Sequence, residues 1–169
     1  MSHRRVFAYL GRALIRIQLN DGIMKDWPNF NENGDLPPGI YQATLAEIIE
    51  HFGESTPQRY IMVGRLARIY TLANQTGHLA RFIIFGSFVT AKPNPGDIDI
   101  FLLMDDAFDA GQLSGEEALI FNHVVAQSYE GASIFWIRRL AALSGEETAI
   151  EHWQLRRDGT KRGIVEVVK

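Results

Sequence analysis

The stretch that most constrains the fold spans residues 81–104 and reads RFIIFGSFVTAKPNPGDIDIFLLM. Two apolar runs, typical of buried strands, flank a glycine-serine corner and a polar excursion. The first strand is expected at Phe82–Phe85, and the second begins with Asp97-Ile98-Asp99-Ile100. Because side chains alternate between the faces of a strand, both aspartates should point to one face and both isoleucines to the other.

The two aspartates form a candidate metal site. Two carboxylates about 7 Å apart on one strand repel each other unless a cation lies between them. Oxygen ligands in this arrangement suit Mg²⁺, which usually takes one or two carboxylates and completes its shell with substrate phosphates. Asp105 has the same strand parity, but six residues of strand separate it from Asp99 by about 20 Å, so it should not bind the same ion.

The Gly86-Ser87 corner supplies candidate phosphate ligands. Glycine allows the chain to turn sharply and to approach a ligand closely. Ser87 offers a hydroxyl and an N–H at a point where a helix can start, which favours phosphate binding. Lys92, in the excursion, could reach the same anion. The alternative is a structural turn and two edge aspartates in an unrelated α/β protein.

At these residues the chain resembles the nucleotidyltransferase superfamily typified by DNA polymerase β. The motif of that superfamily is an apolar residue, Gly-Ser, a spacer and then Asp-apolar-Asp-apolar. Here Phe85, Gly86-Ser87 and Asp97–Ile100 occupy it. The runs NGDLPPG at 33–39, GSFVTAK at 86–92 and KRGIV at 161–165 are similar to one group of small uncharacterised bacterial members. The resemblance therefore covers about residues 28–169.

The resemblance implies an α+β fold, in which helices pack on a small mixed sheet of about four strands. It also implies transfer of an NMP from an NTP to a hydroxyl of a protein, RNA or small-molecule acceptor, with release of pyrophosphate. Asp97 and Asp99 would hold two Mg²⁺ ions about 3.5–4 Å apart, while Gly86 and Ser87, with Lys92 as a weaker candidate, would bind the phosphates. Some minimal members are the antitoxin half of bacterial toxin–antitoxin pairs, so a protein partner is a further expectation.

The third strand, expected at Ala132–Ile137, departs from the pattern of the superfamily. A third acidic residue normally lies there and helps to activate the attacking hydroxyl, but this chain has Ser133 at that position. Glu130 would have to reach in from a loop, and Glu151 lies on an expected helix. General-base assistance typically contributes about 10²–10⁴-fold, whereas metal and positioning effects carry much of phosphoryl transfer. The chain is thus either a slower enzyme or a catalytically reduced nucleotide-binding or protein-interaction module.

Capping signals and turn residues predict the remaining elements. A loop is expected at 27–39, followed by a helix that is capped by Thr44-Leu45-Ala46-Glu47 and closed by Gly53. A second helix should run from Pro57 to about Gln75, and a third, capped by Ser114, should end near Tyr129. A short helix from 143 to about 154 and a last strand at Gly163–Val168 complete the chain. The second helix carries Arg59, Arg65 and Arg68, which are either a triphosphate clamp or its solvated face.

Residues 1–27 carry two competing patterns. A helical stripe includes Phe7, Leu10, Leu14 and Ile17, whereas the segment 15–27, with Asn-Asp-Gly in its middle, is typical of a hairpin. The prediction is a helix followed by a short hairpin, as an N-terminal extension of a domain at residues 28–169.

Composition excludes several classes of protein. The chain has 169 residues and no cysteine, which fits one domain without disulfides or thiolate metal sites. It has no apolar run near the ~18 residues that span a bilayer and no secretory signal, so we expect a cytoplasmic protein without membrane contact. The net charge of −3 combines an acidic middle with two basic ends. An acidic body argues against duplex DNA as a partner, although the ends could contact RNA, a partner or nucleotide phosphate, or simply be solvated.

Overall fold

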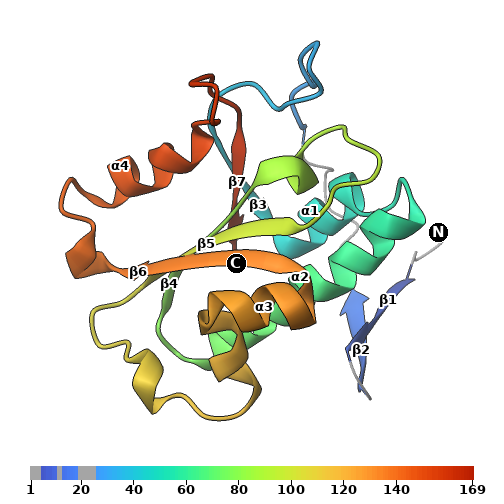
Figure 1. Ribbon diagram of the computed structural model, residues 1–169. Helices are drawn as coiled ribbons and strands as arrows, with labels where there is room; N and C mark the ends of the chain where they lie inside the picture. Colours follow the sequence, from blue (N-terminus) through green and yellow to red (C-terminus); the bar gives the residue numbers. More distant parts are fainter. Residues whose placement is uncertain (1–4, 11–12, 19–25) are drawn as a thin grey trace.

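The computed structural model describes residues 5–10, 13–18 and 26–169, and its centre is a five-stranded mixed sheet (Figure 1). The strands lie in the order β3 (Ile40–Thr44), β7 (Ile164–Val168), β4 (Leu79–Phe85), β5 (Ile98–Met104) and β6 (Ala132–Arg138). β4 is antiparallel to both of its neighbours, while β3–β7 and β5–β6 are parallel pairs. The predicted α+β class with a mixed sheet is confirmed.

The sheet has five strands, not the four or so that the sequence predicted, because residues 40–43 were assigned to no element. Its five residues follow the Pro-Pro-Gly turn and run directly into the cap of a helix. Their partner is β7, and the register places Ile40 opposite Ile164. This pairing joins the two ends of the domain, so no pattern within the short segment itself indicates a strand.

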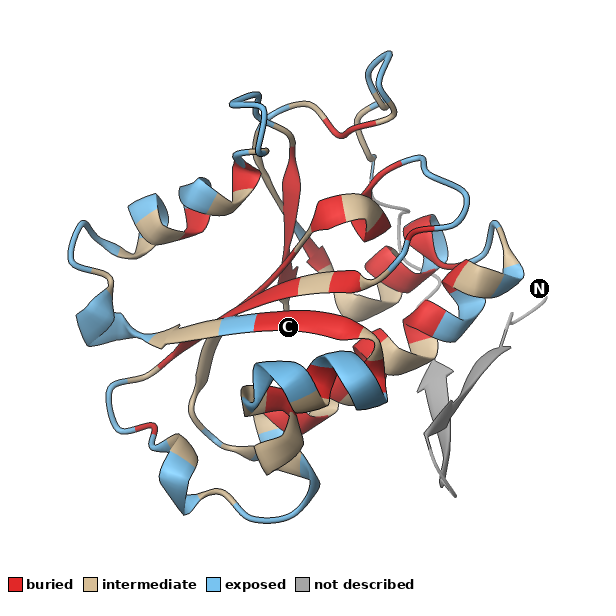
Figure 2. Cartoon of the chain, viewed as in Figure 1, coloured by how far each residue is buried: buried red, intermediate tan, exposed pale blue. Residues whose placement is uncertain are grey.

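Three helices cover one face of the sheet: α1 (Leu45–Phe52), α2 (Pro57–Gln75) and α3 (His123–Glu130). They enclose the larger core, which includes Phe82, Ile84, Ile98 and Ile100 (Figures 1 and 2). The opposite face carries a smaller core in which α4 (Glu146–Glu151) packs on β4 and β5. The 3₁₀ turns are η1 (Gly86–Val89), η2 (Ala110–Gln112), η3 (Glu116–Phe121), η4 (Arg139–Ala141) and η5 (His152–Gln154).

The caps of the first two helices are as predicted. The Thr44 hydroxyl accepts a hydrogen bond from the backbone N–H of Glu47, and the Glu47 carboxylate accepts one from the backbone N–H of Thr44. Thr56 caps α2 in the same way, and Pro57 occupies its first turn. Each cap satisfies N–H groups that the helix itself leaves unpaired.

The capping box predicted at Ser114 is wrong. Gly115 has a φ of +80°, and the 3₁₀ turn η3 follows it. α3 starts only at His123, where the side chain of Asn122 accepts a hydrogen bond from the N–H of Val125. A left-handed glycine directly before the expected first turn prevents the serine side chain from reaching that turn. The short helix after residue 143 exists, but Gly145 precedes it without a side-chain cap.

The helix predicted near the N-terminus is also wrong. β1 (Arg5–Leu10) and β2 (Ala13–Gln18) form an antiparallel hairpin, and β1 lies beside α2 (Figure 1). A stripe of four apolar residues fits two short strands as well as a helix, and β-branched residues such as Ile15 and Ile17 favour strands. The hairpin turn predicted at Asn20-Asp21-Gly22 lies outside the described residues. Within the described parts of the chain, no helix is long and apolar enough to cross a bilayer.

Candidate active site

The glycine-serine corner and the aspartates meet where β4 ends and β5 begins. Phe85, the last residue of β4, is the cross-strand partner of Asp99. Gly86 follows with a φ of +76°, and an added Cβ at this glycine would lie 1.8 Å from Oδ2 of Asp99. The carboxylate therefore lies directly against the backbone of the corner. Only glycine fits this position, because both the left-handed backbone and the close approach exclude a side chain.

The second aspartate precedes β5 and faces the same side of the sheet. Ile98 and Ile100 are fully buried in the core on the helical face, so Asp97 and Asp99 point to the other face, as predicted. Ser133, on β6, is the register partner of Asp99. Its hydroxyl donates a 2.9 Å hydrogen bond to Oδ2 of Asp97. The serine at the position of the missing acid thus orients a carboxylate, although it supplies none.

The electrostatics of Asp99 reflect its burial first and the neighbouring like charge second. Burial and the neighbouring Asp97 carboxylate raise its pKa from 3.8 to about 6, while the Arg162 and Arg157 guanidinium groups oppose that rise. Because ionisation of this carboxylate pair costs free energy, a bound cation would stabilise the ionised form. The pair therefore suits a hard divalent cation, with open coordination positions that phosphate oxygens could fill.

In the described part of the chain, no three acidic or histidine side chains gather closely enough to hold a metal ion. Glu130, which would have had to reach in from a loop, is instead buried at the end of α3 and accepts a 2.9 Å hydrogen bond from Arg68 of α2. Glu151 lies exposed at the end of α4. Asp105 binds His78, which agrees with its predicted exclusion from the site.

The arginines of α2 make different contacts, and Arg59 contradicts both predictions made for these residues. Arg59 is buried, and its guanidinium donates hydrogen bonds to the backbone carbonyls of Phe52, Phe88, Thr90 and Lys92. These bonds hold the chain that follows the glycine-serine corner. Arg68 pairs with Glu130 and Glu116, and Arg65 lies against Gly131. These two are partly buried. Arg59 is therefore neither solvated nor available to phosphate, and Arg68 is already paired with two carboxylates.

The predicted phosphate ligands differ in how they are held. Ser87 lies in η1, half-buried, and its carbonyl accepts a hydrogen bond from the Thr90 hydroxyl. A helical turn therefore does start at the corner. Lys92 is exposed in the excursion, where its backbone carbonyl binds Arg59. The cations that act on Asp99 are Arg157 and Arg162, not Lys92.

A basic loop between η5 and β7, at residues 156–162, lies near the acid pair. The sequence indicated only that this basic end could contact RNA, a partner or nucleotide phosphate, or be solvated. Arg156 donates a 2.6 Å hydrogen bond to the buried Asp35, and Arg162 lies 3.8 Å from the same carboxylate. Asp35 thereby ties the basic loop to the turn that precedes β3. Arg157 is exposed, and its charge lowers the pKa of Asp99, which opposes the rise caused by burial and Asp97. Two runs in the sequence could have indicated this contact: NGDLPPG, which contains Asp35, and KRGIV, which contains Arg162.

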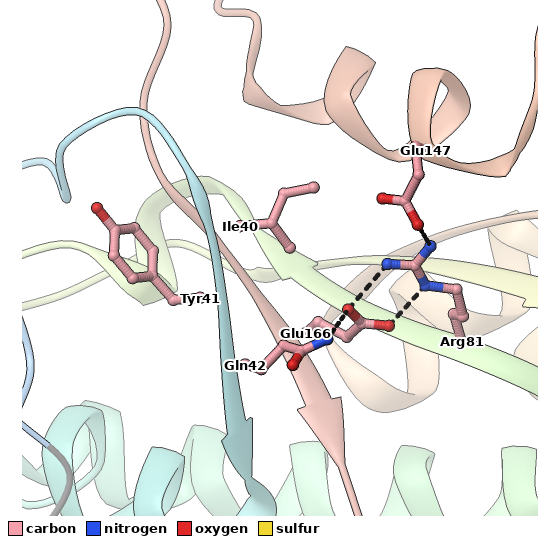
Figure 3. A pocket seen from close by; sticks show the side chains of 6 residues that line it. All are labelled: Ile40, Tyr41, Gln42, Arg81, Glu147 and Glu166. Carbon is pink, nitrogen blue, oxygen red and sulfur yellow. Dashed lines mark hydrogen bonds and ion pairs between the residues drawn. The ribbon is translucent and has the colours of Figure 1, made fainter.

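A separate polar hollow of about 450 Å³ lies on the same face but over β3, β7 and β4 (Figure 3). Its charges pair with one another. Arg81 bridges the buried Glu166 and Glu147 of α4, and Gln42 donates to Glu166. Hydrogen bonds from Arg81 and Gln42 lower the pKa of Glu166 despite its burial. None of its lining residues belongs to the acid pair or the corner.

Comparison with known proteins gives one match. A family model described as a family of unknown function (DUF6932) matches residues 28–168. No curated protein and no solved structure matches the chain.

Proposed function

We propose that this chain, which belongs to the DUF6932 family, is a minimal Mg²⁺-dependent nucleotidyltransferase. It would move an NMP from an NTP to a hydroxyl group of a protein, RNA or small-molecule acceptor. The observation that carries the proposal is the contact between Gly86 and Asp99, because it brings the turn with its phosphate-binding groups and a crowded carboxylate pair to one point. That combination suits a cation and a phosphate together.

Some residues of the site would bind the cation and the phosphates, and others would orient them. Asp97 and Asp99 would hold the cation, and Ser133 fixes the rotamer of Asp97 through its hydrogen bond. Gly86 and Ser87 would bind the β- and γ-phosphates through the backbone N–H and the hydroxyl. Arg157 and Arg162 place positive charge beside the same point, where it would favour the triphosphate. Bound Mg²⁺ would lower the pKa of the acceptor hydroxyl and neutralise charge on the phosphates.

In the transfer step the acceptor oxygen attacks the α-phosphorus in line with the bond to the β-phosphate. The new bond joins the acceptor oxygen to the α-phosphorus, the bond to the bridging oxygen breaks, and pyrophosphate leaves. No carboxylate at position 133 takes the acceptor proton, so the proton passes to water. We expect a slow enzyme, because the general-base contribution of about 10²–10⁴-fold is missing.

A catalytically reduced nucleotide-binding module is the second candidate. The hydrogen bond from Ser133 to Asp97 favours it, since this serine occupies the place at which an attacking hydroxyl would need a base. Such a module would bind the NTP at the same acids and corner without transfer. The two candidates therefore differ in turnover, not in the ligand.

The discriminating experiment is incubation of the protein with each α-³²P-labelled NTP, Mg²⁺ and cell lysate. We expect label to pass to an acceptor in the wild type and in Asp105→Asn, and to be lost in Asp97→Asn/Asp99→Asn. Digestion of the product with protease or ribonuclease then assigns the class of acceptor. Labelling by the double variant equal to the wild type would refute the enzyme. Retention of NTP without transfer by the wild type would favour the binding module.

A further inference from the structure

We propose that an aromatic platform formed by Phe135 and Trp153, beside the buried Phe101, binds the base of a purine nucleoside triphosphate. The inference deepens the proposed function and rests on it, since the platform is the continuation of the phosphate site along the sheet. It assigns binding of the base to aromatic side chains that take no part in the transfer step.

The register of the sheet places the platform beside the acids. Asp99 and Ser133 form one row across β5 and β6, and Phe101 and Phe135 form the next row on the same face. Residues two apart on a strand lie about 7 Å apart. That separation is close to the span of a ribose between its 5′-phosphate and its base. A nucleotide whose phosphates contact Gly86 and the acids therefore has its base within reach of these rings.

Phe135 and Trp153 leave part of their surface open to solvent, whereas Phe101 is only 2% exposed. Trp153, from η5, lies over the strands with its ring centroid 5.0 Å from that of Phe101 and 5.1 Å from that of Phe135. Phe85, the partner of Asp99, lies 4.6 Å from the same indole and connects the cluster to the corner. Phe135 is 38% exposed because β6 is an edge strand, and Trp153 is half-buried. An exposed aromatic surface of this kind is suited to stacking against a planar ring.

We expect this surface to bind a purine, which is the larger class of base. Base–aromatic stacking tolerates any base, and preferences among bases follow the strength of stacking. A two-ring purine covers more of the joined surface of Phe135 and Trp153 than a pyrimidine does. The imidazole of His123 lies 5.3 Å from the ring of Phe135, so a polar group is available at the rim for the edge of the base.

Calorimetric titration of the wild type with Mg²⁺ and unreactive ligands tests the platform. The ligands are α,β-methylene ATP, α,β-methylene CTP, tripolyphosphate and the dinucleotide ApA. We expect the ATP analogue to bind about tenfold more tightly than the CTP analogue, with tripolyphosphate weaker still. Phe135→Leu keeps apolar volume but removes the ring, and should reduce ATP-analogue affinity about tenfold without changing that for tripolyphosphate. Tyr129→Leu, at a 75% exposed aromatic residue of α3, is the matched control and should change neither.

Each other outcome counts against the inference in a distinguishable way. If tripolyphosphate binds as tightly as the ATP analogue, the triphosphate site stands but the platform is refuted. Equal affinity for the two nucleotide analogues refutes the purine assignment and needs no variant. ApA binding as tightly as the ATP analogue assigns the rings to an RNA acceptor instead. Absence of binding by tripolyphosphate and by both nucleotides overturns the proposed function and this inference together.

Discussion

Replacing Asp99 by asparagine should stabilise the metal-free protein at neutral pH. The substitution keeps the shape of the side chain against Gly86 but removes the charge that burial and Asp97 make unfavourable. In the folded protein the pKa of Asp99 is about 6, above its ordinary value of 3.8. Ionised Asp99 therefore destabilises the folded state, so the wild type loses stability as the pH rises through this window.

The size of the effect follows from the same two pKa values. A rise from 3.8 to about 6 corresponds to about 3 kcal/mol when the group is fully ionised. Solvent screening of this partly exposed carboxylate reduces the expectation to about 2 kcal/mol. Near pH 4.5 the folded group is protonated, and the difference between Asp99→Asn and the wild type should fall to about 1 kcal/mol or less.

The assay is urea denaturation with EDTA between pH 4 and pH 8, in which a change of midpoint at constant m reports stability. Glu151→Gln, on the exposed end of α4, is the control and should show no comparable gain at high pH. Mg²⁺ should then stabilise the wild type and leave Asp99→Asn nearly unchanged, since a ligand stabilises only the state that binds it. A variant that is equally stable or less stable than the wild type at pH 7.5 would refute the claim of a crowded carboxylate pair.

Two further predictions concern residues beside the acids. Arg59→Lys should destabilise the protein by about 3 kcal/mol, because lysine cannot satisfy the four backbone carbonyls that the guanidinium binds. The loss would be measured as a lower urea midpoint, and a loss below about 1 kcal/mol would contradict the prediction. Ser133→Asp supplies a carboxylate between Asp97 and the register partner Asp99, and should increase both the thermal shift caused by Mg²⁺ and the rate of NMP transfer about tenfold or more. An unchanged shift and rate would show that position 133 does not face the cation.

The sequence predicted those parts of the fold and site that depend on local patterns. Alternation along a strand placed Asp97 and Asp99 on one face, and Gly86 was correctly predicted to make a sharp turn. The group that lies against it is Asp99, while the predicted approach to a ligand stays a prediction. The capping box at Thr44 was likewise predicted from residues that are neighbours in the sequence. Whether these residues bind a cation and an NTP stays a prediction.

The parts that the sequence did not predict depend on contacts between distant segments. β3 is a strand only because β7 returns to pair with it. Arg59 has the appearance of a surface arginine in the sequence, yet the chain after the corner folds over it. The basic loop faces Asp99 because Asp35, more than a hundred residues earlier, binds Arg156. Amphipathic periodicity and caps carry no information on such pairings.

The most direct test of the central claim is calorimetric titration of Mg²⁺·α,β-methylene ATP into the wild type and into Asp97→Asn/Asp99→Asn. The account predicts saturable binding at one site by the wild type, dependent on the divalent cation, and affinity at least about tenfold weaker in the double variant. Equal affinity of the two proteins, or binding by the wild type that EDTA leaves unchanged, would contradict a single cation-and-phosphate site at the aspartates and the glycine-serine corner.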